Sequence, residues 1–341
     1  MYIFHHCDDD GRSAAAIIKA ELTVVFDQPS DDRFIEYAHT GILTCPEDVK
    51  ENETVYIVDL SLDNVVFGLI KELVTKYNCN VIHIDHHKTT FDTLAGLSGE
   101  DKQIMNKVTK FYKEGISGSL LTWVYACMDE DERIRCNDVP FDFSDKRTHV
   151  AFNYDTPDIR EYRIPTIIRF IDDNDVWRHE IDETKYFTLA FQMETDKNPC
   201  NELWYLLIYG SDARVYEYVN KGKILWSYQE SINEKMLRNA FEYEIDGHKC
   251  LCLNTPYGNS RVFNDKFDEY PMVCKFSYTG LHTWRYSFYS SEKHPDSVDV
   301  SVIAKKLGGG GHKHASGATL SYNMFEHNTC NIYEDDEVDG L

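Results

Sequence analysis

The chain has 341 residues, 42% hydrophobic and 13% aromatic, which is enough for one large core or two smaller ones. Its formal net charge of −23 argues against a broad surface for long duplex nucleic acid, because the phosphate backbone would be repelled. No apolar run is long enough to span a bilayer, and the N-terminus lacks a secretory pattern, so we expect a cytoplasmic protein without a membrane partner. Ten scattered cysteines without a CxxC pair indicate reduced thiols rather than disulfides or a zinc site.

The chain begins with a short strand, an acidic loop and a helix. Residues 2–4 are apolar, residues 5–11 carry two histidines and three consecutive aspartates, and residues 14–20 favour a helix. Three adjacent carboxylates repel one another unless a cation lies among them, and N-capping of the helix would explain only one of them. The segment therefore predicts a cation-binding loop between a strand and a helix.

Two further apolar strands also end in acids or histidines. Residues 54–58 run into Asp59, and residues 81–84 run into Asp85, His86 and His87, with helical spacing over 64–77 between them. Three such units predict a parallel sheet with right-handed crossovers. In these sheets chemistry gathers beyond the carboxyl ends of the strands. A hydrated polar turn would explain one such ending more readily than three.

The remaining sequence completes a two-lobed α/β prediction. Residues 118–128 favour a helix, residues 129–158 form a polar insertion without an assigned role, and residues 164–177 end in a fourth acidic cluster. The pattern becomes strand-like from residue 241, with a helix at 300–307. We expect a parallel-sheet catalytic domain over 1–190, an aromatic-rich helical linker over 191–240, a smaller α/β domain over 241–325 and an acidic tail over 326–341.

A run of four glycines precedes His312 near the end of the second predicted domain. Successive glycines can turn their backbone N–H groups toward an anion. The alternative, a flexible linker, fits less well because a strand follows so soon. The glycine-rich loop is therefore a candidate for holding a substrate phosphate.

The candidate ligands are carboxylates and imidazoles, without thiolates at equivalent positions. This composition suits Mn²⁺ or Mg²⁺, and the histidines favour Mn²⁺. Enough acids gather for two ions, which at about 3.5–4 Å apart would clamp a phosphoester for in-line attack.

These motifs resemble those of the DHH phosphoesterase superfamily. Asp85-His86-His87 resembles the motif that names it, residues 6–11 its first motif, Asp59 its second and residues 173–177 its fourth. Residues 309–312, with Ala315 and Gly317, resemble the GGGH signature of the DHH-associated domain. The resemblance covers residues 1 to about 325 in family order and is greatest to the nano-RNase B-like oligoribonucleases. It implies a metal-binding DHH domain followed by a substrate-gripping DHH-associated domain.

The resemblance also implies roles for individual residues. One ion would be held by His6, Asp8 and Asp59, with His5 as the alternative histidine because many relatives have theirs where this chain has Phe4. The second ion would be held by Asp10, Asp59, His86 and one acid among Asp172, Asp173 and Asp175, with a slight preference for Asp173. Asp85 would orient an imidazole, and His87 would face the scissile phosphate. Proposed substrate contacts are Gly309, Gly310, Gly311, His312 and Arg285, with Arg261 a further candidate; either arginine could equally be a solvated residue.

The resemblance implies a Mn²⁺-dependent phosphodiesterase that hydrolyses very short oligonucleotides (nano-RNA) to mononucleotides. An acidic exterior favours short substrates, since affinity must then come from the cleft. Hydrolysis of cyclic mono- or dinucleotides is the alternative activity, and a non-catalytic nucleotide sensor is the alternative class. A processive exonuclease of the RecJ type should show basic grooves with stacking aromatics and is less favoured. A homodimer is left open.

Overall fold

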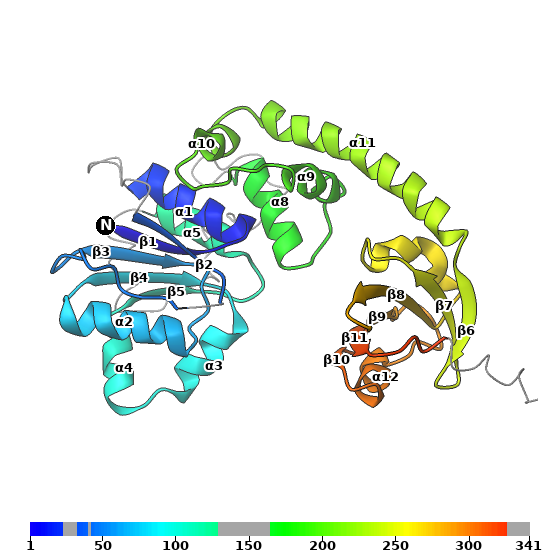
Figure 1. The fold of residues 1–341 in the computed structure, drawn as a ribbon. Coiled ribbons are helices and arrows are strands. Elements are labelled where there is room, and N and C mark those ends of the chain that lie inside the picture. The colour runs from blue at the N-terminus through cyan, green and yellow to red at the C-terminus, as the bar shows by residue number, and fades with distance from the viewer. Residues whose placement is uncertain (23–32, 40–41, 129–163, 326–341) are drawn as a thin grey trace, which may run out of the picture. The chain divides into compact units, whose positions relative to one another are not determined.

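The computed structural model describes residues 1–22, 33–39, 42–128 and 164–325 (Figure 1). The predicted insertion at 129–158 and the predicted tail at 326–341 lie outside the described residues. The chain divides into two compact units, Met1–Leu225 and Trp226–Leu341. Among the described helices, none combines the length and the apolar character needed to cross a bilayer.

The first unit is built on a five-stranded, fully parallel sheet, as predicted, with the strand order β2-β1-β3-β4-β5. Its strands are β1 (Tyr2–His6), β2 (Phe34–Tyr37), β3 (Thr54–Val58), β4 (Asn80–Asp85) and β5 (Thr109–Tyr112). The two edge strands were not predicted, because each has only four residues and an interrupted apolar pattern. The three central strands are the apolar runs that the sequence predicted.

Helices cover both faces of this sheet (Figure 1). One layer contains α1 (Asp9–Leu22), α5 (Gly118–Cys127) and α8 (Thr166–Asp175), and the other contains α2 (Asn64–Lys76), α3 (Lys88–Gly96) and α4 (Gly99–Met105). Successive strand residues point to opposite faces. Ile3 accordingly packs in the first core and Phe4 in the second, both fully buried. Burial on both sides explains why these strands are continuous apolar runs.

The predicted linker over 191–240 requires correction, because much of it belongs to the first unit. The helices concerned are α9 (Thr184–Phe191), α10 (Glu202–Ile208) and α11 (Asp212–Leu237). Their buried side chains, among them Phe191, Trp204 and Val219, join the core beneath α1 and α5. The boundary between the units lies inside α11, between Leu225 and Trp226. Burial of the aromatic residues therefore extends the first unit well beyond residue 190.

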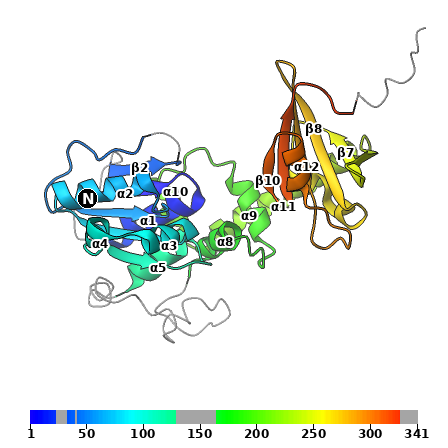
Figure 2. The ribbon, with the colours of Figure 1, turned by 90° about the horizontal axis from the view of Figure 1, so that it is seen from below.

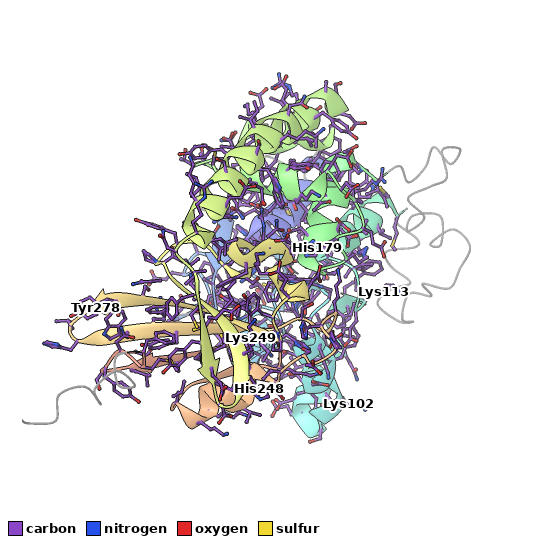
Figure 3. All side chains as sticks on the ribbon, turned by 90° about the vertical axis from the view of Figure 1, so that its right-hand side faces the viewer. Lys102, Lys113, His179, His248, Lys249 and Tyr278 are labelled. Carbon is purple, nitrogen blue, oxygen red and sulfur yellow. The ribbon has the colours of Figure 1, made fainter. Side chains whose placement is uncertain are left out.

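The second unit is a six-stranded sheet with the order β10-β11-β9-β8-β7-β6, in which only β7 and β8 pair in parallel. Its strands are β6 (Phe241–Ile245), β7 (His248–Asn254), β8 (Met272–Gly280), β9 (Thr283–Tyr289), β10 (Gly310–His312) and β11 (Ala315–Leu320). Helix α12 (Val300–Lys306) lies against one face, as Figure 2 shows, and the 3₁₀ segment η2 (Ser260–Asp268) packs on the other. Figure 3 shows Tyr278 near the tip of the β8–β9 hairpin. The prediction of a two-lobed α/β protein is confirmed.

The glycine-rich segment is a hairpin rather than a linker. Strand β10 pairs with β11 through Gly310 opposite Gly317 and His312 opposite Ala315. A Cβ atom at Gly309 would lie 2.1 Å from the carbonyl oxygen of Gly317, so the close approach requires glycine there.

Candidate metal centre

The functional side chains of the first unit meet because β1, β3 and β4 are adjacent and parallel. Their carboxyl ends lie at one edge of the sheet, where they bring together His6, Asp59 and the Asp85–His87 segment. The loop after β1 adds Asp8, the first turn of α1 adds Asp10, and the C-terminal end of α8 adds Asp175. Segments distant in the sequence thus form one acidic site, as the strand-end argument predicted.

The first ligand group consists of His6, Asp8 and Asp59, whose ligand atoms all lie within 4.8 Å of one another. The Nδ1 atom of His6 is 2.6 Å from Asp8 Oδ2 and 4.0 Å from Asp59 Oδ2. Asp8 Oδ1 also accepts a hydrogen bond from the backbone N–H of Gly11 at 2.9 Å, which fixes the acidic loop.

The second ligand group consists of Asp10, His86 and Asp175. The Nε2 atom of His86 is 3.8 Å from Asp10 Oδ2 and 3.5 Å from Asp175 Oδ2. The same atom is 3.1 Å from Asp59 Oδ1, so Asp59 lies between the two groups. This is the position that a carboxylate bridging two ions would require.

Asp85 and His87 form a hydrogen-bonded pair next to these two groups, and His87 also belongs to a third ligand group, with Asp59 and His86. His87 Nδ1 lies 2.7 Å from Asp85 Oδ1, and Thr90 donates its hydroxyl to the other carboxylate oxygen. Burial alone would lower the pKa of His87, but the hydrogen bond and charge of Asp85 outweigh it and raise that pKa. Burial would likewise raise the pKa of Asp85, yet the contact with His87 lowers it. The pair therefore favours a carboxylate next to an imidazolium.

The carboxylates of the site repel one another in the absence of cations. Burial and the neighbouring charges of Asp10 and Asp8 raise the pKa of Asp59 well above its ordinary value. Burial and the same two neighbours raise the pKa of Asp175 to about 8. The buried Oδ2 atom of Asp175 makes no hydrogen bond to any described residue. Divalent cations would neutralise the repulsion between the carboxylates and would give the Asp175 oxygen a partner. The donor set therefore fits Mn²⁺ or Mg²⁺.

Two of the alternatives left open by the sequence are distinguished by geometry. Asp173 does not join any of the ligand groups found among the described residues; its carboxylate accepts hydrogen bonds from the backbone N–H groups of Glu180 and Ile181, at 2.8 and 3.3 Å. We therefore propose Asp175, in place of Asp173, as the ligand from this acidic cluster. His5 is buried, and its Nδ1 lies 2.8 Å from the carbonyl oxygen of His6, whereas His6 faces the acids.

The N-terminus of α5 supplies contacts that the sequence did not predict. The backbone N–H groups of Gly118 and Ser119 donate to the two carboxylate oxygens of Asp10, at 2.6 and 2.8 Å. A Cβ atom at Gly118 would lie 2.7 Å from the Cβ of Asp59. The helix thus positions one candidate ligand by hydrogen bonds and another by close packing. In the sequence, Ser117 indicates where the helix begins. No sequence pattern near Ser117 indicates a contact with Asp10, which lies more than one hundred residues earlier.

Two ion pairs hold the elements around the site. The Nζ atom of Lys197 lies 2.7 Å from Oδ1 of Asp9, the first residue of α1. Asp172 is fully buried, accepts a hydrogen bond from the Ser117 N–H at 2.7 Å and pairs with Arg178 at 2.5 Å. Asp172 therefore connects α8 to the start of α5 instead of joining a ligand group.

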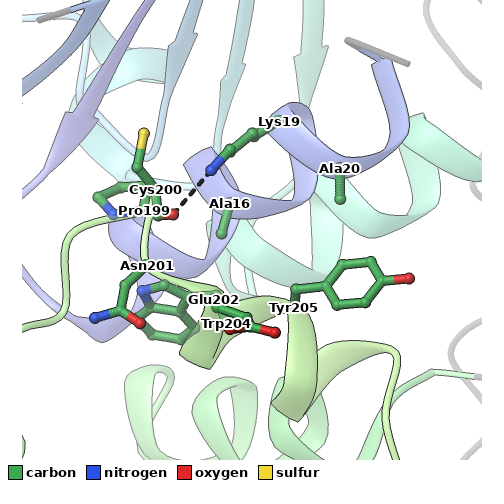
Figure 4. Close-up of a pocket in the computed structure, with 9 residues that line it drawn as sticks. All are labelled: Ala16, Lys19, Ala20, Pro199, Cys200, Asn201, Glu202, Trp204 and Tyr205. Atoms are coloured by element: carbon green, nitrogen blue, oxygen red, sulfur yellow. Dashed lines mark hydrogen bonds between the residues drawn. The ribbon is translucent and has the colours of Figure 1, made fainter. Parts of the chain in front are cut away.

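A separate pocket of about 370 Å³ lies between α1 and the start of α10 (Figure 4). Lys19 extends along it and donates to the carbonyl oxygen of Cys200 at 2.9 Å. Its lining includes Trp204 and Tyr205 but none of the candidate metal ligands.

The predicted substrate contacts all belong to the second unit. His312 and Gly311 are exposed on the β10–β11 hairpin, and Arg285 is exposed on β9. Arg261, the further candidate, lies 3.6 Å from the centre of the Trp226 ring and 3.9 Å from Glu230. Arg261 is thus engaged with α11, while the other residues keep their predicted roles as proposals.

In motif order and in the convergence of its strand ends, the chain resembles the DHH phosphoesterase superfamily. No family model matches it. An uncharacterised protein of Acanthamoeba polyphaga mimivirus is 26% identical over 286 residues, which are 79% of this chain and 54% of the relative. The chain thus spans about half the length of the curated relative that it matches.

Solved structures superpose over most of the chain, but with TM-scores below 0.5. A pGpG-specific phosphodiesterase of Vibrio cholerae, PggH, aligns with 94% of this chain and 93% of its own at a TM-score of 0.46 and 13% identity. A DHH domain described as a member of the s1p family of ribosomal proteins aligns with 94% of this chain and 82% of its own, at a TM-score of 0.48 and 16% identity. The exonuclease RecJ bound to manganese aligns with 94% of this chain and 85% of its own, at a TM-score of 0.36 and 15% identity. Scores below 0.5 establish neither a shared fold nor a shared activity, so function must be inferred from this chain's own residues.

Proposed function

We propose that the protein is a cytoplasmic, Mn²⁺-dependent phosphodiesterase that hydrolyses very short oligonucleotides to mononucleotides. The observation that carries the proposal is the convergence of two ligand groups around Asp59. His6, Asp8 and Asp59 would hold one ion, and Asp10, Asp59, His86 and Asp175 the other. When bound, the two ions would supply an activated water and neutralise charge on the phosphoryl oxygens.

The protein's own groups complete the proposed site. Asp85 orients His87 through its 2.7 Å hydrogen bond and favours the imidazolium. His87 would face the scissile phosphate, where a positive charge and a proton stabilise the departing oxygen. The Gly118 and Ser119 N–H groups keep Asp10 in place.

The proposal also assigns substrate binding to the second unit. Gly309, Gly310, Gly311, His312 and Arg285 would contact the phosphate end of the substrate. Such contacts suit a short ligand, because a net charge of −23 repels a long polyanion. Replacing His312 by Ala should raise KM for a dinucleotide more than it lowers kcat.

The decisive experiment measures release of mononucleotide from a labelled dinucleotide, a cyclic dinucleotide and a long single strand, each with Mn²⁺ and with chelator. We expect Mn²⁺-dependent hydrolysis that is fastest for the linear dinucleotide. Preference for the cyclic compound would replace the proposed substrate, and fastest cleavage of the long strand would contradict the argument from charge. Binding without turnover of any of them would instead identify a sensor.

A further inference from the structure

The turn that follows α8 displays an exposed aromatic residue beside the candidate metal centre. Asp175 ends the helix and faces His86, and Trp177 follows two residues later. The Trp177 side chain is 80% exposed, so most of its ring is accessible to a ligand. Core packing therefore does not account for the position of this ring, and we ask which ligand could contact it.

Hydrogen bonds fix the turn itself from within. The Asp173 carbonyl oxygen accepts from the N–H groups of Arg178 and His179, at 3.1 and 3.3 Å. The Asp173 carboxylate accepts from the next two N–H groups, those of Glu180 and Ile181. The Arg178 side chain points back to buried Asp172. Several hydrogen bonds thus fix the backbone of the turn, whereas the Trp177 ring is mostly exposed to solvent.

The backbone around the indole is in a conformation that costs free energy. Trp177 and His179 have φ angles of 56° and 52°, in the left-handed region that L side chains rarely adopt. Strain of this kind persists only where the surrounding bonds impose it and is common at ligand-binding sites. Here the Asp173 hydrogen bonds impose it.

The rings of Trp177 and His179 contact each other edge to face, with centroids 5.3 Å apart and planes at 80°. The imidazole therefore supports the indole from the side without stacking on it. A flat, largely exposed indole on a hydrogen-bonded turn is the kind of surface on which a nucleobase stacks.

We propose that Trp177, supported by His179, is a stacking platform for a nucleobase of the substrate whose phosphate lies at the candidate metal centre. This inference rests on the proposed function and deepens it, since it specifies a base-bearing substrate rather than any phosphoester. Stacking tolerates every base, so the platform gives affinity for nucleotides without strong sequence preference. Trp177 contacts the base and takes no part in the chemistry.

Three variants test the platform by kinetics. Trp177→Ala removes the ring, Trp177→Phe keeps an aromatic face, and Tyr205→Ala is the matched control, because Tyr205 is 60% exposed and lines the separate pocket on α10. For a dinucleotide, we expect Trp177→Ala to raise KM about ten- to a hundredfold with little change in kcat. Trp177→Phe should recover most of the loss, and Tyr205→Ala should behave as wild type.

A dinucleotide analogue without bases provides the specificity control. If Trp177 stacks on a base, Trp177→Ala should leave the kinetics of this analogue unchanged. An equal rise in KM for both substrates, or no rise for either, would overturn the platform.

Calorimetric titration with AMP and Mg²⁺ tests the platform separately from turnover. A tenfold weaker Kd in Trp177→Ala, but not in Tyr205→Ala, would support the platform even if the wild-type protein hydrolysed none of the oligonucleotides. Equal Kd values, or absence of AMP binding to the wild-type protein, would overturn it. A change of oligomeric state in Trp177→Ala with an unchanged Kd would also overturn it and assign the indole to a protein contact.

Discussion

At the scale of single residues, the site is dominated by repulsion between carboxylates. The ligand atoms of Asp10 and Asp175 lie within 4.8 Å of each other, next to a buried Asp59. Two charges at that distance repel by roughly 3 kcal/mol when the effective dielectric constant is about 20. The arrangement therefore favours the binding of either protons or cations, which is the physical basis of the proposed metal dependence.

Replacing Asp59 by Asn should separate function from stability. The amide keeps the shape against which Gly118 packs but removes the negative charge. We expect Mn²⁺-dependent turnover to fall about a thousandfold or more, because the candidate bridging ligand is lost. The metal-free protein should unfold at the same temperature or higher, since repulsion is relieved. Full activity in Asp59→Asn would rule out the bridging role.

The metal-free protein should lose stability as the pH rises. Asp175 has a pKa of about 8 in the folded state, above its ordinary value of 3.8, so the folded protein retains a proton that the unfolded chain releases. This stabilisation is complete below about pH 4 and is lost as the pH rises through 8. Melting with a chelator between pH 5 and 8 should show the decline. Asp175→Asn should reduce the slope without abolishing it, because the pKa of Asp59 is raised as well, and a slope unchanged in that variant would contradict the assignment.

Asp173 and Asp175 should differ when each is replaced by Ala. Asp175→Ala should weaken Mn²⁺ binding at least tenfold while preserving the fold. Asp173→Ala leaves the Glu180 and Ile181 N–H groups without their acceptor and should lower stability by about 1–3 kcal/mol. Calorimetric Mn²⁺ titration and thermal melting distinguish the two, and reversed outcomes would restore Asp173 as the ligand.

At the scale of elements, α5 connects the two ligand groups to the rest of the first unit. Its first two N–H groups hold Asp10, while Asp172 on α8 holds the N–H of the Ser117 cap. The partial positive charge of a helix N-terminus stabilises a carboxylate there. Positioning of the ligands thus depends on how α5 and α8 pack.

Gly118→Ala should displace residues of the ligand groups without unfolding α5. The added Cβ would lie 2.7 Å from the Cβ of Asp59, so Asp59 or the helix must move. We expect Mn²⁺ affinity to fall about ten- to a hundredfold, comparable with the loss of other ligand-orienting contacts. Gly96→Ala is the control, because outside the adjoining residues and the helix's own backbone no heavy atom lies within 4 Å of the added Cβ. Equal Mn²⁺ affinity in both variants would contradict the positioning role.

At the scale of the whole molecule, the chain divides into two compact units, each with its own sheet and core. All the ligand groups found among the described residues belong to the first unit. Metal binding stabilises only the structure to which the ion binds.

Scanning calorimetry should therefore show two transitions, only one of which responds to Mn²⁺. Saturating Mn²⁺ should raise the melting temperature of the first unit, and chelator should reverse the change. The transition of the second unit should remain where it was. A Mn²⁺ shift that affects both transitions equally would indicate that the units unfold as one.

Sequence by itself determined the parallel sheet, the order of the acid- and histidine-bearing motifs and most of the candidate ligands. This was possible because strands buried on both faces are continuous apolar runs, and because parallel strands bring their carboxyl ends to one edge. The strand-end pattern thus placed the acids and histidines of these loops together, and the resemblance to the DHH superfamily singled out His6, Asp8, Asp10, Asp59 and His86 among them. Short edge strands such as β2 lacked that pattern and were missed.

Only the tertiary structure decided which acid of the fourth motif faces His86, and what positions Asp10. On α8, the buried acids Asp172 and Asp173 make hydrogen bonds to protein groups, whereas Asp175 at the helix end points to the site. The bonds from α5 to Asp10 cross more than one hundred residues of sequence. No local pattern encodes such a contact, because it depends on how packed helices bring distant backbone groups together.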